Sequence, residues 1–233
     1  MKRGIWFLLF LLAGYAQFQV LFPVTYKKSD TLNVLATKLN LREKPESKSP
    51  VIEVIPYGAK VAVMERTSVP FTSEGIYGFW VRVKYGKNTG YIFDGYLSVL
   101  PAPPENCKSL EDYADRKFGK SGNKIEKKIT PEDEKNGLSQ KYIQNYKNGA
   151  MLEFVAAYES DWQILTLKNI SLEEGFLIGR LCGGQNSNVF KGKNFSPPKD
   201  DKIHVQGDSV VIEELEIQKT KNGDVRIKAW HGV

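Results

Sequence analysis

Apolar and polar positions alternate over short stretches between residues 31 and 100, and each stretch ends at a turn signal. Val51–Ile55 is mostly apolar and stops at Pro56-Tyr57-Gly58, while Phe79–Tyr85 alternates up to the turn residues Gly86–Gly90. Runs of this length are typical of half-buried strands joined by tight turns. The pattern predicts a small all-β barrel over residues 31–100.

The alternation stops at Pro101-Ala102-Pro103-Pro104, where three prolines stand within four residues. Proline fixes φ and lacks a backbone donor, so this segment favours an extended linker over a helix or a central strand. We therefore place a proline-rich linker at residues 101–106 and a second domain at residues 107–233.

Two stretches of the second domain open with capping boxes, Ser-Leu-Glu-Asp from Ser109 and Ser-Leu-Glu-Glu from Ser171. They predict helices over residues 109–118 and 171–181. Strands are predicted at Lys141–Tyr146, Ala150–Tyr158, Trp162–Leu167, Lys202–Val205, Ser209–Gln218 and Val225–Trp230. The segments between them at 119–137 and 182–202 are predicted to be loops. This order of elements predicts an α+β domain with an antiparallel sheet covered by two helices.

The N-terminus has the three parts of a secretory signal. Lys2 and Arg3 precede the apolar run Gly4–Ala13, which ends at the small residues of Gly14-Tyr15-Ala16. We expect a signal peptide over residues 1–16, cleaved after Ala16, with an uncleaved anchor as the alternative. The protein is then exported, either periplasmic or secreted, and meets a membrane only through an uncleaved signal. No nucleic-acid partner is expected.

Basic residues outnumber acidic ones, 33 Lys and Arg against 27 Asp and Glu, which gives a net charge of +6. The densest basic cluster lies at Arg116, Lys117, Lys120, Lys124, Lys127 and Lys128. A solvated loop is the simpler interpretation of this cluster, and a contact site for anionic polymers of the envelope is the alternative.

The sequence has two cysteines, Cys107 and Cys182, both in the second domain. An even pair in an exported protein predicts a disulfide between them, and the alternative is two buried free thiols. Cys107 lies just before the first predicted helix and Cys182 just after the second. Antiparallel helices side by side would bring these two ends together.

Residues suited to catalysis or metal binding are sparse. The two histidines, His204 and His231, do not have the spacing of zinc ligands. Cys182 follows a predicted helix, where the helix dipole opposes a thiolate nucleophile. Glu214 and Glu216 share one face of a predicted strand, which we interpret as a solvated sheet face. We therefore predict no catalytic residue, no metal site and no cofactor.

The first domain contains a series of motifs in a characteristic order. They are Leu39-Asn-Leu-Arg42 with Pro45, Val51–Glu65, Trp80–Tyr85 with Thr89–Ile92, and Gly95-Tyr-Leu97. In these motifs residues 36–100 resemble the bacterial SH3 (SH3b) domains. The resemblance implies an SH3-like barrel, with Gly58 and Gly90 in turns. It also implies a core that includes Leu41, Val61 and Val81, and a loop over residues 66–78 that is longer than usual in the family.

Members of this family bind cell-wall peptides or other envelope ligands, so the resemblance implies a ligand-binding module. Aromatic side chains outside the alternating core positions are candidates for such contacts because rigid rings lose little entropy on binding. The candidates are Tyr57, Phe71, Tyr77, Phe79 and Tyr96. Ordinary barrel packing is the alternative role for each of them.

Together these features predict an exported bacterial SH3b-domain protein that binds peptidoglycan, or an envelope protein or peptide, without catalysis. One alternative is a cell-wall-modifying hydrolase that uses the SH3b domain as a targeting module. Another is a secreted inhibitor or effector built on the disulfide-linked second domain.

Overall fold

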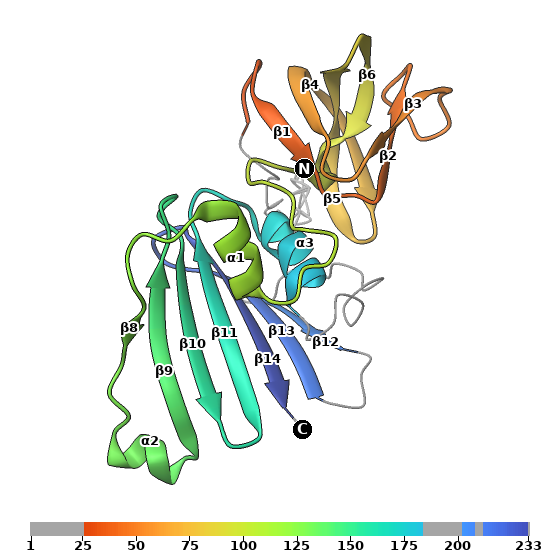
Figure 1. Ribbon diagram of the computed structural model, residues 1–233. Coiled ribbons are helices and arrows are strands. Elements are labelled where there is room, and N and C mark those ends of the chain that lie inside the picture. The colour runs from red at the N-terminus through yellow and green to blue at the C-terminus, as the bar shows by residue number, and fades with distance from the viewer. Residues whose placement is uncertain (1–25, 184–201, 208–211, 233) are drawn as a thin grey trace, which may run out of the picture.

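The computed structural model describes residues 26–183, 202–207 and 212–232 (Figure 1). Within these residues the chain forms two seven-stranded sheets, with helices packed on one face of the second. The predicted signal peptide at residues 1–16, its cleavage after Ala16 and nearly all of the loop predicted over 182–202 lie outside the described residues. No helix in the described part of the chain is long and apolar enough to cross a membrane.

The first sheet curls on itself and is here called the curled sheet. Its strands are β1 (Thr31–Val34), β2 (Lys38–Arg42), β3 (Val51–Pro56), β4 (Lys60–Ser73), β5 (Ile76–Tyr85), β6 (Asn88–Phe93) and β7 (Leu97–Ser98), with a 3-10 helix, η1, at Asp94–Tyr96. Their order is β3-β2-β6-β5-β4-β1-β7. Leu41, Val61 and Val81 are buried inside it, as the family resemblance implies.

The prediction of a loop over residues 66–78 is wrong, because β4 and β5 continue through this segment as one long hairpin. The two strands remain paired out to Ser73 and Ile76, and the chain reverses at Glu74-Gly75, where both residues have positive φ. Thr67, Val69 and other β-branched residues of this stretch favour strand structure. Pro70, which cannot donate to the ladder, borders a shift of register.

Gly90 does not lie in a turn, in contrast to the role that the family resemblance implies. The hairpin turns at Gly86-Lys87, and Gly90 lies within β6, opposite Val83. A methyl group at Gly90 would be 2.6 Å from the backbone oxygen of Arg42. The residue is therefore glycine because β2 approaches β6 closely there. Gly58 does lie in a turn, with φ of +74°.

The second sheet and its helices form the α+β arrangement that the sequence predicts. Its elements are α1 (Leu110–Phe118), β8 (Ile125–Glu126), α2 (Pro131–Lys135), β9 (Leu138–Asn145), β10 (Met151–Ala157), β11 (Ser160–Leu167), α3 (Leu172–Cys182), β12 (Lys202–Gln206), β13 (Ile212–Lys219) and β14 (Val225–Gly232). The strands are antiparallel, in the order β12-β13-β14-β11-β10-β9-β8. Helices α1 and α3 cover one face (Figure 1).

The prediction of a loop over residues 119–137 is only partly correct, because this segment also contains β8 and α2. The short helix α2 begins at Pro131, and Thr130 caps it. The Thr130 hydroxyl accepts from the Asp133 backbone N–H, and the Asp133 carboxylate accepts from the Thr130 N–H in return. This is a capping box with proline at the first helical position, a recognised signature of a helix start.

Helix α3 lies unusually close to the second sheet because two of its residues are glycines. A methyl group at Gly175 would be 2.7 Å from Cγ1 of Val225, and one at Gly179 would be 2.8 Å from Cδ1 of Leu215. The predicted disulfide between Cys107 and Cys182 is present, with the two Cα atoms 5.2 Å apart. It joins the chain just before α1 to the last residue of α3.

The proline-rich segment is packed between the two sheets. Ala102 is buried, the Tyr57 hydroxyl donates to the Pro103 oxygen at 2.6 Å, and the Tyr113 hydroxyl donates to the Pro101 oxygen at 2.9 Å. One continuous hydrophobic core holds Leu35, Ile76 and Phe93 of the first unit together with Ala102 and the buried faces of α1 and α3. The segment does not keep the two units apart, and the division at residues 101–106 stays a prediction.

Candidate functional site

A groove lined by aromatic rings lies on the curled sheet and encloses a volume of about 160 Å³. Its side chains come from β2, β4, β5, β6, η1 and the turn after β2. They are Lys38, Leu39, Asn40, Arg42, Ser47, Phe71, Trp80, Phe93 and Tyr96. We call this the aromatic groove.

The rings of the aromatic groove contact one another in sequence. The Phe71 ring centroid lies 5.3 Å from that of Trp80 and 5.2 Å from that of Phe93, and Phe93 lies 5.3 Å from Tyr96. The Tyr96 hydroxyl donates to Ser73 Oγ at 2.9 Å. These contacts, tilted between Phe71 and Trp80 and edge-to-face in the other two pairs, hold each ring in place. The apolar floor is therefore formed before any ligand arrives.

Two glycines give the Phe93 ring its place in the floor. A methyl group at Gly78 would lie 2.7 Å from Cε2 of Phe93, and one at Gly95 would overlap the Cζ of the same ring. Gly78 lies on β5 and Gly95 in η1. The Phe93 ring occupies the space beside these two glycines, and a side chain at either position would collide with it. The shape of the groove therefore depends on glycine at both positions.

A buried carboxylate, Asp94, fixes η1 and with it Tyr96. Its Oδ1 accepts from the Phe79 N–H at 2.6 Å and its Oδ2 from the Tyr26 hydroxyl at 2.8 Å. Burial raises the pKa of Asp94, and these hydrogen bonds together with the nearby Arg66 guanidinium work against that rise. Burial likewise raises the pKa of Tyr96, which leaves its hydroxyl neutral and able to donate.

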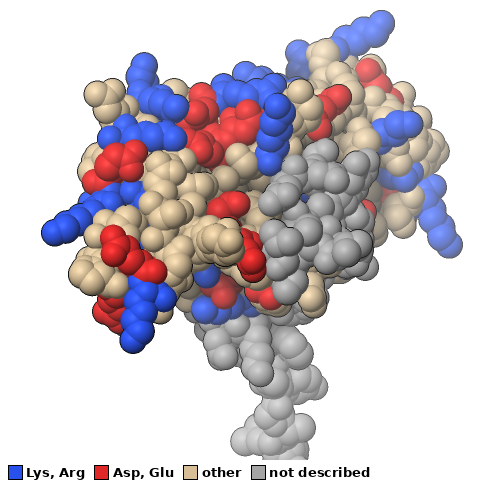
Figure 2. All heavy atoms as spheres, turned by 60° about the horizontal axis from the view of Figure 1, so that its bottom comes forward, with Lys and Arg blue, Asp and Glu red and all other residues tan. Residues whose placement is uncertain are grey.

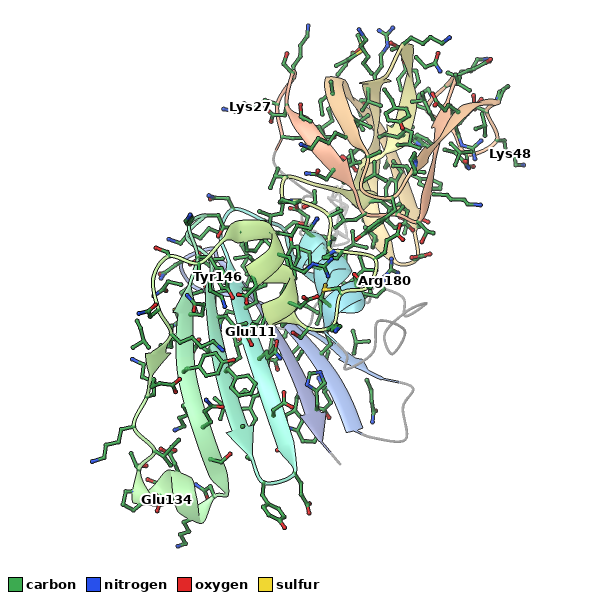
Figure 3. All side chains as sticks on the ribbon, in the orientation of Figure 1. Lys27, Lys48, Glu111, Glu134, Tyr146 and Arg180 are labelled. Atoms are coloured by element: carbon green, nitrogen blue, oxygen red, sulfur yellow. A yellow bond between two sulfur atoms is a disulfide. The ribbon has the colours of Figure 1, made fainter. Side chains whose placement is uncertain are left out.

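Basic side chains stand at the rim of the aromatic groove. Lys38 is exposed, and Arg42 donates from Nη1 to the Ser49 oxygen at 2.6 Å. A second hollow of about 400 Å³ shares Lys38 and Tyr96 with the groove and extends to Arg180 on α3. Arg180, which Figure 3 labels beside α3, forms an ion pair with Glu74 of the first unit at 2.7 Å. The floor is thus apolar and the edges carry positive charge.

The five aromatic residues singled out from the sequence fall in three places. Phe71 and Tyr96 line the aromatic groove. Tyr57 faces the proline-rich segment through its bond to Pro103. Tyr77 and Phe79 contact each other at 5.5 Å and alternate with the groove-facing residues of β5, so they lie on the opposite face of the hairpin.

The residues of the groove that the sequence did not single out include Trp80, Phe93, Lys38 and Arg42. Trp80 and Phe93 occupy positions whose alternation indicates core, and both are in fact largely buried. Only the curl of the sheet turns an edge of each ring toward the groove. Nothing in the local pattern predicts this, because it depends on strands far apart in the sequence.

Three of the six residues of the basic cluster that begins at Arg116 are paired with acidic residues of α1. Arg116 lies 3.3 Å from Asp112, Lys120 lies 2.8 Å from Asp115, and Lys124 lies 2.9 Å from Glu111. Basic and acidic side chains also alternate over the face shown in Figure 2. The pairing supports the interpretation of a solvated surface over that of an anion-binding patch.

Both cysteine sulfur atoms are engaged in the disulfide, so neither is a thiol in this structure. His231 is buried, with Nδ1 3.1 Å from Asp161 Oδ1 and Nε2 2.8 Å from the Gly183 oxygen. Among the described residues, no group of three or more His, Cys, Asp and Glu side chains could hold a metal ion.

The curled sheet, with its aromatic groove and basic rim, is formed by the segment whose motifs resemble the bacterial SH3 domains. Comparison with family models agrees, because residues 37–98 match the model of the bacterial SH3 domain. The chain therefore carries a bacterial SH3 domain, as the motifs of this segment indicate. Comparisons with curated proteins and with solved structures gave no match for the chain.

Proposed function

We propose that this protein is an exported, non-catalytic binding protein of the bacterial cell envelope, and that its aromatic groove binds peptides of the cell wall. The observation that carries the proposal is a continuous floor of four aromatic rings beside Lys38 and Arg42, within a bacterial SH3 domain. Pockets that bind small ligands combine an apolar lining with a few placed polar groups in this way.

The chemistry of the groove suits a short peptide with free carboxylates. Rings fixed by packing offer apolar contact at little entropic cost. Lys38 and Arg42 offer charge-assisted hydrogen bonds to carboxylates, and Asn40 adds a neutral donor and acceptor. Wall peptides combine small apolar side chains with carboxylates, so they match both features.

The proposal is tested by sedimentation of the purified protein with insoluble peptidoglycan. Lys38→Glu reverses a charge at the rim, and we expect it to reduce the bound fraction, since it repels carboxylates. Lys84→Glu makes the same change at an exposed position of β5 outside the groove and serves as the matched control. Equal binding by the two variants would contradict the proposed site.

A second comparison locates the binding face. Phe71→Ala removes a groove ring, whereas Tyr77→Ala removes a ring from the opposite face of the hairpin. If stacking on the ligand matters, Phe71→Ala should weaken binding by about 1–3 kcal/mol while Tyr77→Ala has little effect. Both variants must first show the circular dichroism spectrum of the folded protein. The reverse order of effects would move the site to Tyr77 and Phe79.

The non-catalytic part of the proposal has its own test. A turbid suspension of peptidoglycan should stay turbid in the presence of the protein. Clearing that is abolished by Glu214→Gln or Glu216→Gln would instead favour a wall hydrolase with its carboxylates on β13.

A further inference from the structure

A second candidate site lies on the face of the second sheet that is turned away from α1 and α3 (Figure 1), here called the outer sheet face. The registers of β12, β13, β14, β11, β10 and β9 align its side chains in rows across the sheet. One row is Gln206, Glu214, Trp230, Trp162, Val155 and Lys141. The next row is His204, Glu216, Lys228, Ile164, Glu153 and Ile143.

Two tryptophans stand side by side at the centre of this face. Trp162 of β11 pairs directly with Trp230 of β14, and both are only partly buried. Neighbouring strands lie about 4.8 Å apart, so the two tryptophans occupy adjacent positions on the outer sheet face. The Lys228 ammonium lies 5.7 Å from the centroid of the Trp162 ring.

The position of Trp230 is built into the backbone. Its indole occupies the space above Gly232, where a methyl group would lie 2.5 Å from Cη2 and 2.7 Å from Cζ2. The ring can lie against the strand only because residue 232 is glycine. The backbone therefore fixes the orientation of this ring, as a preformed binding surface requires.

A hollow of about 340 Å³ adjoins Trp230 and is lined by His204, Glu214, Glu216 and Lys228. Glu216 pairs across the strands with His204 on one side and Lys228 on the other, and Lys202 Nζ lies 3.4 Å from its carboxylate. Hydrogen-bond donors and acceptors thus alternate beside Trp230.

The charges of the outer sheet face indicate which class of ligand it can bind. Basic side chains of this face are paired with acidic ones, Lys202 with Glu216, Arg226 with Glu153 and Lys141 with Asp133. These pairs leave little net positive charge to attract a polyanion such as a teichoic acid. Charged groups in the middle of the face would be costly to bury in lipid or under an apolar protein surface. A neutral ligand with flat apolar faces and many hydroxyl groups suits this pattern best.

We infer that the outer sheet face binds a neutral, β-linked saccharide chain, with sugar rings on Trp162 and Trp230 and hydroxyl groups bonded to Glu214, Glu216 and Lys228. Sugar rings with equatorial substituents present C–H groups to an indole, and carboxylates accept from neighbouring hydroxyls. This site shares no residue with the aromatic groove. It would let one chain hold both the peptide and the glycan of a wall polymer.

The test is calorimetric titration of the purified protein with tetramers of β-1,4-linked N-acetylglucosamine and of β-1,4-linked glucose. We expect saturable binding of at least one tetramer, and a loss of affinity of tenfold or more in Trp162→Ala and in Trp230→Ala. Gly232→Ala should weaken binding by displacing the Trp230 ring, while Trp230→Phe should retain part of the affinity. Met151→Ala, on the same face but in a third row with Thr166 and Arg226, is the matched control and should bind as the unaltered protein does.

Lys38→Glu separates this inference from the proposed function, because it should leave the affinity for the tetramers unchanged. Circular dichroism establishes that each variant is folded. The inference is overturned if neither tetramer binds, or if both folded tryptophan variants bind as well as the unaltered protein. It is also overturned if light scattering finds a dimer that Trp162→Ala dissociates, since a second copy would then cover the face.

Discussion

The carboxylate of Glu174 joins the curled sheet to the second unit. Its Oε1 accepts from the Val99 N–H at 3.0 Å, and its Oε2 accepts from the Ser171 N–H at the start of α3 at 3.0 Å. The side chain is almost completely buried, and this burial raises its pKa to about 7. Glu173 and Asp94 are also buried, and burial raises the pKa of each.

The titration of Glu174 predicts that the protein loses stability as the pH rises from 4.5 to 7. The folded protein keeps the proton up to about pH 7, whereas the unfolded chain loses it near 4.5. The folded state therefore binds more protons in this window, and the free energy of unfolding should fall by about 3 kcal/mol across it. Urea unfolding at a series of pH values measures this change.

Glu174→Gln should flatten this profile, and the exposed Glu65→Gln is its control and should not change it. A residual slope from Glu173 and Asp94 remains in both variants because their pKa values are raised in the same direction. A Glu174→Gln profile as steep as that of the unaltered protein would show that another group carries the pH dependence.

Gly90 and Gly86 differ in what a side chain would meet, and this difference predicts two distinct effects. A methyl group at Gly90 would meet the Arg42 oxygen, whereas one at Gly86 meets nothing within 4 Å and suffers only from a φ of +56°. Gly90→Ala should lower the free energy of unfolding by about 3 kcal/mol and Gly86→Ala by about 1 kcal/mol. Chemical denaturation of both variants checks the order, and equal losses would contradict the close approach of β2 to β6.

Single residues also show how far the sequence predicts the site. Phe71 and Tyr96 stand outside the alternating pattern, and the fold brings both into the groove. Trp80 and Phe93 follow the pattern of core residues, so their second role at the groove could not be predicted. A pattern along one strand reports which side is buried, but it does not report which strands curl together.

At the scale of elements, the helix starts were the most predictable features. Ser109 and Ser171 cap α1 and α3 through bonds to Asp112 and Glu174, as their spacing predicts. The same rule applied to Thr130 would have found α2, which was missed in a lysine-rich segment. The long β4–β5 hairpin was missed for a different reason, because Pro70 and Gly75 look like loop residues unless the register across the hairpin is known.

The disulfide between the start of α1 and the end of α3 closes a long loop, with a sequence separation of 75. The chain-entropy model assigns about 4 kcal/mol to a loop of this size. Replacing both cysteines, Cys107→Ser with Cys182→Ser, should lower the free energy of unfolding by about this amount in urea. A reducing agent should destabilise the unaltered protein to a similar extent and leave the double variant unaffected. Equal stability with and without the disulfide would contradict its structural role.

At the scale of the whole molecule, the proline-rich segment connects the two units through buried contacts. Leu35, Ile76 and Phe93 of the first unit belong to the same core as α1 and α3, and Arg180 pairs with Glu74 across the junction. The sequence suggested a linker because proline excludes helix and central strand. It could not show that an extended segment would be packed on both sides, since that depends on tertiary contacts alone.

The shared core predicts that the two units unfold together. Scanning calorimetry of the purified protein should show one transition, since separating the units would expose Ile76 and Phe93 to water. Two well-separated transitions would mean that the core is divided. A fragment of residues 26–104 that is as stable as the whole chain would also mean that the core is divided.

The proposed binding of cell-wall peptide in the aromatic groove of the bacterial SH3 domain can be observed residue by residue. The most direct measurement is amide chemical-shift mapping of the isotope-labelled protein during titration with a soluble wall peptide. We expect saturable shifts of the amides around Lys38, Asn40, Phe71, Trp80 and Tyr96, and smaller shifts at the same peptide concentration in Lys38→Glu. Shifts that cluster around Tyr77 and Phe79, or the absence of any saturable shift, would contradict the proposed site.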